Sequence, residues 1–294
     1  MGLVPYMGGD ELIKKDIVRL LPPADIFIEG FGGSGAVSIE VARRRMYRKV
    51  IWNDKDTYLY YIWYYMKYEP DRFIPKLALM LSNLTKMTKE EWLEFKNKVV
   101  KRMLDLINRE ALPPFTGALV YAYILYGMSI PYEGGIMRKR EKLRTVEYYI
   151  NFLRRRAEWI KDIEILNRDI FELLDEYDKE GVVFYLDPPH IIKKNGYIRT
   201  GYYRISFKIK DARRFSRKLA EIKNAKILLK LSETDLPYYP EVREKYQMHV
   251  LRYISMASQK KGKKRYYFFT NYEIMRKDLL AILLYNYSSS GETV

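Results

Sequence analysis

The tetrad Asp187-Pro188-Pro189-His190 directly follows the apolar run 182–186. A short run of β-branched and aromatic residues, closed by two prolines, is typical of a buried strand that ends at the prolines. Asp187 is then a carboxylate at the carboxyl edge of a sheet, where open α/β sheets bind their ligands. The alternative interpretation is an ordinary Asx-Pro turn.

This tetrad has the groups needed to activate an aromatic amine. The exocyclic amino group of adenine or cytosine is a poor nucleophile, because its lone pair is delocalised into the ring. The carboxylate of Asp187 and the carbonyl of Pro188 can accept its hydrogens and favour a tetrahedral nitrogen that can attack. Proline holds that carbonyl at a fixed geometry, because its φ is locked. His190 would then stack on the face of an extruded base.

A second set of candidate ligands follows another short strand, predicted over 26–29. This strand runs into Gly30-Phe31-Gly32-Gly33-Ser34-Gly35 and a helical pattern over 36–45. Such a glycine turn lets the backbone approach a ligand and presents free helix N–H groups to it. Asp54 ends the next predicted strand, 50–54, where it can accept hydrogen bonds from ribose hydroxyls. A purely structural turn and a helix N-cap at Asp54 are the alternatives.

The spacing of these elements predicts the fold class. Two strands joined by a crossover helix make one unit of a parallel sheet. Residues 58–144 show helical repeats without a convincing strand, after which the α/β alternation resumes. We therefore predict an α/β fold with a mostly parallel Rossmann-like sheet in a catalytic domain, residues 1–57 and 145–294, and an inserted helical domain, residues 58–144. The other predicted elements are helices over 13–21, 146–159 and 212–222 and strands over 163–166, 182–186, 226–231, 248–255 and 265–270.

The composition restricts the partners and the kinds of site. Lys and Arg outnumber Asp and Glu by 53 to 37, which favours a polyanion such as nucleic acid. An anionic membrane or plain solubility would account for the same charge. The absence of Cys and the presence of only two His exclude thiolate and His-rich metal sites, so no metal is expected. The most apolar segment, 115–131, contains glycines and falls short of a spanning helix, which predicts a soluble, cytoplasmic protein.

Two basic segments, 138–140 and 260–265, are candidate phosphate contacts. A solvated charged loop is the alternative for each, and Lys193 and Lys194 are expected in a mobile loop that could close over the extruded base. His249, in an apolar strand, is expected to be structural. The candidate DNA-binding residues are Arg138, Lys139, Arg140, Lys193, Lys194, Lys260, Lys261, Lys263 and Lys264.

Six motifs occur in an order that resembles the D12 class of adenine-N6 DNA methyltransferases, the Dam-like family. The resemblance covers nearly the whole chain. The motifs are Pro5-Tyr6-Met7-Gly8-Gly9, the turn and its flanks at 27–37, Ile51-Trp52-Asn53-Asp54, the segment 167–174, Tyr185-Leu186 with the tetrad, and Phe269-Thr270-Asn271-Tyr272.

The resemblance implies methyl transfer from S-adenosylmethionine to N6 of a flipped-out adenine in double-stranded DNA, with the helical block recognising the target. A cognate restriction nuclease would fit this activity, a monomer is favoured, and no membrane partner is expected. The same fold could instead methylate cytosine N4 or RNA, or the chain could be a non-catalytic DNA-binding relative. The residues implied to hold the cofactor are Tyr6, Gly8, Gly9, Glu29, Phe31, Gly33, Gly35, Asp54, Asp169, Ile170 and Asp187.

Three departures separate this chain from the family pattern. Family members usually carry tyrosine or phenylalanine where this chain has His190, and lysine where Asp10 follows the paired glycines. The segment 126–140 lacks the Arg and Asn-Gly consensus that is common in the recognition loop. The recognised DNA sequence therefore cannot be carried over.

Overall fold

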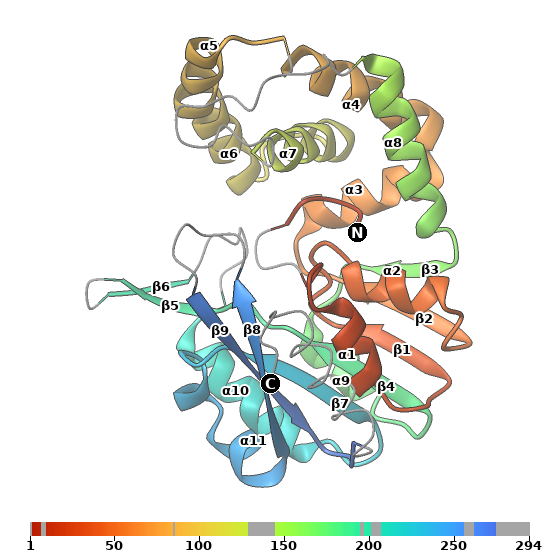
Figure 1. Ribbon diagram of the computed structural model, residues 1–294, viewed down its shortest axis with the longest axis vertical. Coiled ribbons are helices and arrows are strands. Elements are labelled where there is room, and N and C mark those ends of the chain that lie inside the picture. The colour runs from red at the N-terminus through yellow and green to blue at the C-terminus, as the bar shows by residue number, and fades with distance from the viewer. Residues whose placement is uncertain are drawn as a thin grey trace, which may run out of the picture.

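The computed structural model describes residues 2–6, 10–84, 86–128, 145–194, 197–200, 207–255 and 262–274. A seven-stranded sheet runs through the lower half of the molecule in the order β3-β2-β1-β4-β7-β9-β8 (Figure 1). The first five strands in this order are parallel, and β9 pairs antiparallel with both β7 and β8. This confirms the predicted α/β class with a mostly parallel sheet. The strands are β1 (Ile26–Glu29), β2 (Lys49–Asn53), β3 (Ile163–Leu166), β4 (Val182–Leu186), β7 (Lys226–Leu231), β8 (Gln247–Ser255) and β9 (Gly262–Thr270).

Helices cover both faces of this sheet. Successive side chains of a strand point to opposite faces, so Val183 and Tyr185 join one hydrophobic core while Phe184 and Leu186 join the other. The core with Tyr185 is covered by α1 (Lys14–Leu20) and α2 (Ala36–Arg43), and the other by α9 (Ile170–Glu176), α10 (Ile209–Glu221) and α11 (Pro240–Lys245). This doubly covered arrangement leaves the carboxyl ends of the parallel strands as the edge at which a ligand can bind.

A block of helices stands above that edge in Figure 1. It begins with α3 (Thr57–Tyr68), whose buried Trp63 stacks on Trp52 of β2 with ring centroids 4.3 Å apart. One continuous core therefore joins the helices to the sheet. The domain boundaries at 58 and 144 stay a prediction, and α8 (Val146–Trp159), beyond the second boundary, packs against α4. The other helices of the block are α4 (Pro70–Leu84), α5 (Lys89–Glu94), a π-helical segment (Phe95–Val100), α6 (Lys101–Asn108) and α7 (Pro114–Met128).

The structure differs from the sequence-based expectation in four places, one of which is the unpredicted helix α9. The segment expected as a mobile loop contains the antiparallel strands β5 (Ile191–Lys194) and β6 (Tyr197–Thr200). Its sequence carries a hairpin signal, because Asn195-Gly196 is the dipeptide that two-residue hairpin turns favour. The strand β9 begins within the basic run, at Gly262, and the short helix α11 was not predicted. Within the described ranges, no helix is long and apolar enough to cross a bilayer.

Candidate active site

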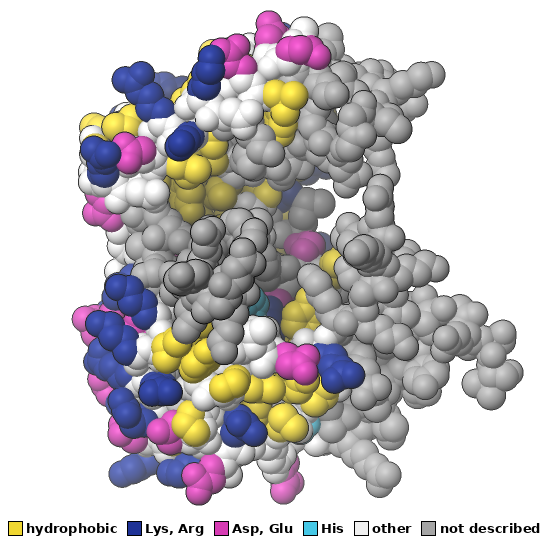
Figure 2. Space-filling view, turned by 90° about the vertical axis from the view of Figure 1, so that its left-hand side faces the viewer, with side chains coloured by type: hydrophobic (Ala, Val, Ile, Leu, Met, Phe, Trp, Pro, Cys, Tyr) yellow, Lys and Arg dark blue, Asp and Glu magenta, His cyan; other side chains and the backbone are white. Residues whose placement is uncertain are grey.

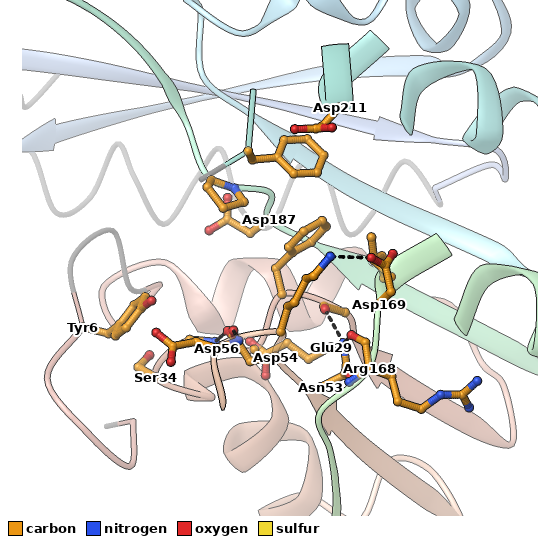
Figure 3. A pocket seen from close by; sticks show the side chains of 18 of the residues that line it. Tyr6, Glu29, Ser34, Asn53, Asp54, Asp56, Arg168, Asp169, Asp187 and Asp211 are labelled. Carbon is orange, nitrogen blue, oxygen red and sulfur yellow. Dashed lines mark hydrogen bonds and ion pairs between the residues drawn. The ribbon is translucent and has the colours of Figure 1, made fainter. Parts of the chain in front are cut away.

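A cleft lies where the carboxyl ends of β1, β2 and β4 meet, and it encloses about 1170 Å³ including its open mouth. In Figure 3 Asp187 lies on one side of this space, with Asn53 and Asp54 on the other. Gly35, Pro188 and His190 lie outside the lining. Gly8, Gly9, Arg138, Lys139, Arg140, Lys260 and Lys261 fall outside the described residues, as do the side chains of Lys193, Lys194, Lys263 and Lys264. The predicted site residues that line the cleft are Tyr6, Glu29, Phe31, Gly33, Asp54, Asp169, Ile170, Asp187 and Pro189.

The glycine turn packs tightly against the two stacked tryptophans. Gly35, which precedes α2, has a φ of +66°, and a Cβ added there would lie 2.3 Å from the ring of Trp63. A Cβ on Gly32 would lie 2.1 Å from Nε1 of Trp52. Because both indoles are fully buried, neither can move aside. These glycines are therefore required by packing as well as by close approach of a ligand.

Asp54 anchors the glycine turn. Its Oδ2 accepts a hydrogen bond from the Gly33 N–H at 2.9 Å, and its Oδ1 accepts one from the Asp56 N–H at 2.8 Å. The N-cap of α3 is Asp56, which accepts from the N–H groups of Tyr58 and Leu59. The N-cap alternative considered for Asp54 thus belongs to its neighbour. Both oxygens of Asp54, which lines the cleft, are thus engaged by backbone N–H groups that shape the turn around it.

Asn53 is a positioning residue that the sequence reasoning missed. Its amide nitrogen donates to the carbonyls of Gly30 at 3.0 Å and Arg168 at 3.2 Å, and its Oδ1 accepts from the Arg168 N–H at 2.9 Å. One buried side chain thus joins the segments that follow β1, β2 and β3. The signal that could have revealed it is an amide at the end of an apolar strand, where a buried polar group must find partners.

Asp169 and a group of aromatic rings form another wall. Asp169 caps α9 by accepting from the Phe171 N–H at 3.0 Å, and its other oxygen lies 2.5 Å from Nζ of Lys55. Phe31 and Phe207 meet edge to face with centroids 5.6 Å apart. Phe171 and Phe207, which were not predicted, line the cleft together with Phe31. The wall can receive a flat aromatic group.

Asp187 presents one paired oxygen and one unpaired oxygen. Its Oδ2 lies 2.7 Å from Nζ of Lys230, whereas its Oδ1 is buried and has no hydrogen-bond partner within the part of the chain that the structure describes. Burial raises the pKa of this carboxyl group to about 6, against the opposing effect of the Lys230 ammonium. An unsatisfied buried acceptor is rare and costly, so it marks a place where a donor from a ligand can bind.

Lys230 and Asp10 form a buried ion pair behind Asp187. The Nζ of Lys230 contacts Oδ1 of Asp10, and the Tyr185 hydroxyl donates to the other oxygen of Asp10. The acid Asp10 stands where the family resemblance leads us to expect lysine, and the cation comes from β7 instead. Sequence reasoning missed this pair. The available signal was a lysine inside the apolar strand 226–231, because a buried ammonium needs partners.

His190 is held from behind by a buried acid. Its Nδ1 lies 2.9 Å from Oδ2 of Asp235, and Oδ1 of Asp235 accepts from the Ile191 N–H at 2.8 Å. Burial disfavours the imidazolium, but Asp235 and Asp187 outweigh it, so the pKa of His190 is raised above its ordinary value. His249 lies outside this site and contacts Thr270 at 3.2 Å, as expected of a structural residue.

Basic side chains are dispersed over the described surface. Figure 2 shows Lys and Arg on both the helical block and the sheet-bearing half, interspersed with Asp and Glu. The cleft itself differs in charge, because seven acidic and three basic side chains line it. The acids are Asp10, Glu29, Asp54, Asp56, Asp169, Asp187 and Asp211, and the bases are Lys55, Arg168 and Arg214. A cationic ligand fits this lining better than an anionic one.

Comparisons with known proteins agree with this geometry. A family model described as D12 class N6 adenine-specific DNA methyltransferase matches residues 6–257. The chain is also similar to the type II methyltransferase M.MjaIII of Methanocaldococcus jannaschii, with 30% identity over 229 residues. The aligned region covers 74% of this chain and 78% of that protein.

Proposed function

Because the chain belongs to the D12 class of N6 adenine-specific DNA methyltransferases, we propose that its cleft binds S-adenosylmethionine beside an extruded adenine whose amino group Asp187 holds. The observation that carries this proposal is Asp187 in the lining of the cleft, with a buried Oδ1 that has no hydrogen-bond partner among the described residues. The adenine N6 amino group supplies the donor that this acceptor lacks. In this DNA adenine methyltransferase, the proposed binding site of the target adenine is therefore at Asp187.

The cleft fits the proposed cofactor in shape and charge. S-adenosylmethionine supplies an electrophilic methyl group on a cationic sulfonium. Phe31, Phe171 and Phe207 offer a wall for its adenine ring, and Asp54 lies where ribose hydroxyls can donate. The excess of acids suits a ligand that carries sulfonium and ammonium charges. Tyr6, Glu29, Gly33, Asp169 and Ile170 complete the lining proposed to hold it.

Residues of the tetrad act on the amino group. Asp187 and the carbonyl of Pro188 accept its two hydrogens, which localises the nitrogen lone pair and aligns it for in-line attack. His190, with its orientation fixed by Asp235, stacks on the base. Extrusion of the base costs a few kcal/mol, which stacking of about 1–3 kcal/mol and edge contacts offset.

We further propose double-stranded DNA as substrate, with helices α3 to α7 reading the target and with a restriction nuclease of the same specificity as partner. The name of the relative, a type II methyltransferase, supports the restriction-modification setting. Sequencing plasmid DNA from cells that express the protein, with a readout of N6-methyladenine, would identify the target. Methylation without any fixed sequence context would contradict this part of the proposal.

The role of Asp187 is tested with two matched substitutions, one in the cleft and one outside it. Asp187→Asn should lower the single-turnover rate of N6-methyladenine formation by on the order of a thousandfold, because it removes the charged acceptor. Asp162→Asn makes the same chemical change at an exposed position outside the cleft and should leave the rate near the parent's. Binding of S-adenosylmethionine, measured by titration calorimetry, should persist in both. A near-parental rate for Asp187→Asn would refute the assignment.

A further inference from the structure

We infer that Lys230 is a positioning residue for methyl transfer: with Asp10 as counter-ion, it keeps Asp187 ionised and occupies Oδ2, which leaves Oδ1 for the amino group. Lys230 lies in β7, outside every motif that identified the site. The inference rests on the role proposed for Asp187. Its test is chosen so that the two can fail separately.

Strand register brings the two residues together. Strand β4 pairs in parallel with β7 with Leu186 opposite Leu229. Continuing this register by one residue places Asp187 opposite Lys230, on the face of the sheet that also carries Tyr185. The sheet itself therefore fixes the contact of 2.7 Å between Lys230 Nζ and Asp187 Oδ2.

Lys230 is held on three sides, which makes its position definite. Its side chain is only 1% exposed, and Nζ contacts Asp10 and Asp187 and lies 5.4 Å from the ring centroid of Tyr266. Asp10 is fixed in turn by the Tyr185 hydroxyl. A hydrophobic residue would fill this strand position without the cost of burying an ammonium. The buried charges are thus best explained by the carboxylate that they orient.

The charges around Asp187 act on it in opposite directions. Burial raises the pKa of the Asp187 carboxyl group and so favours its protonated form, which accepts hydrogen bonds from an amino group less well than the carboxylate. Lys230 and His190 lower the pKa of Asp187, whereas Asp10 raises it. Removing the cation and removing its counter-ion should therefore have effects of opposite sign. The titratable groups that face Asp187 are Lys230, Asp10, His190, Glu29, Tyr185, Tyr239 and Tyr266.

The test is a direct titration of Asp187 in the full-length protein. Carbon-13 NMR of carboxyl-labelled aspartate, with Asp187→Asn to assign the signal, follows its ionisation without any DNA or cofactor. Lys230→Met should raise the pKa of Asp187 and Asp10→Asn should lower it. Lys226→Met, which changes an exposed lysine of the same strand, is the matched control and should not move the signal.

A double variant serves as a control in case Lys230→Met alone fails to fold. Lys230→Met alone leaves Asp10 buried without its cation, whereas Asp10→Asn/Lys230→Met removes both charges. The double variant should unfold at the same urea concentration as the parent, which would show that removal of both charges leaves the fold intact. Because Lys230 lowers the pKa of Asp187 more than Asp10 raises it, the methyl-transfer rate of the double variant should fall by on the order of tenfold at pH 6 and recover toward pH 9, as Asp187 ionises.

Three outcomes separate the inference from the function it rests on. An Asp187 titration that stays unchanged in Lys230→Met and in the double variant overturns the inference, as does an equal loss of rate at every pH. If Asp187→Asn remains active while the titration shifts as described, the proposed role of Asp187 fails and the control of its ionisation by Lys230 stands.

Discussion

The two walls of the cleft are built from contacts of very different range. On the cofactor side, Glu29 accepts a hydrogen bond from Ser38, nine residues away in the sequence, and Asp54 accepts one from Gly33, twenty-one residues away. On the acceptor side, Lys230 and Asp10 are 220 residues apart. The first wall contains a glycine turn that belongs to one strand-turn-helix-strand unit and forms locally, and Asn53 and Lys55 tie this unit to Arg168 and Asp169. The surroundings of Asp187 are assembled only when distant parts of the chain come together. Damage to the first should therefore affect folding and donor binding, and damage to the second should affect chemistry.

The largest effect is expected from Gly35→Ala on the cofactor side. The added methyl group meets Trp63 at 2.3 Å and forces alanine to a φ of +66°. We expect a loss of about 2–4 kcal/mol in the free energy of unfolding, measured in urea, and at least tenfold weaker S-adenosylmethionine binding. Lys15→Ala, at an exposed position of α1, should change neither. Near-parental stability of Gly35→Ala would contradict the packing role of this turn.

On the acceptor side, the ionisation of Asp187 should determine how the rate of methyl transfer depends on pH. Only the ionised form of Asp187 accepts the amino hydrogens, and burial raises its pKa to about 6. As the pH falls through this value the carboxylate is lost, so kcat/KM should fall about tenfold per pH unit below it. Measurements at constant ionic strength between pH 5 and 8 test this. A flat profile would mean that no acceptor carboxylate titrates in this range.

A smaller effect is expected when the base-stacking position is changed. His190→Phe keeps a flat ring and should retain methyl-transfer activity within about threefold, whereas His190→Ala should lose at least tenfold, in line with ~1–3 kcal/mol of stacking. Steady-state rates with a DNA substrate measure both. Complete inactivity of His190→Phe would instead point to a specific hydrogen bond from the imidazole.

A change at Glu29 should be visible in the pH dependence of the free energy of unfolding. Burial raises the pKa of Glu29 from 4.5 to about 8. Between pH 4.5 and pH 8, Glu29 is therefore protonated in the folded chain and ionised in the unfolded chain. Stability therefore falls as pH rises through this window. In Glu29→Gln, the side-chain oxygen can still accept both hydrogen bonds from Ser38. The free energy of unfolding of this variant should exceed the parent's by on the order of a few kcal/mol near pH 9 but by little near pH 4.5. Equal gains in urea unfolding at both pH values would contradict this.

The same difference in range explains what the sequence could predict. Asp187, Glu29 and Asp54 were placed correctly at the sheet edge, because each ends an apolar run whose length and terminators are local signals. The pairing of Asp10 with Lys230 and of His190 with Asp235 has no local pattern, since it depends on which strands become neighbours. The hairpin of β5 and β6 was missed for another reason, a turn signal that was interpreted as a flexible loop.

The stacked indoles also set a limit on engineering. Trp63 belongs to the first helix after β2, yet its ring forms part of the packing behind the turn at Gly35. Replacing helices α3 to α7, in order to change the DNA sequence that we propose they recognise, would remove this support if the graft began at the start of α3. A junction placed after Trp63 would retain it, so the useful boundary for recombination lies inside that helix rather than at its start.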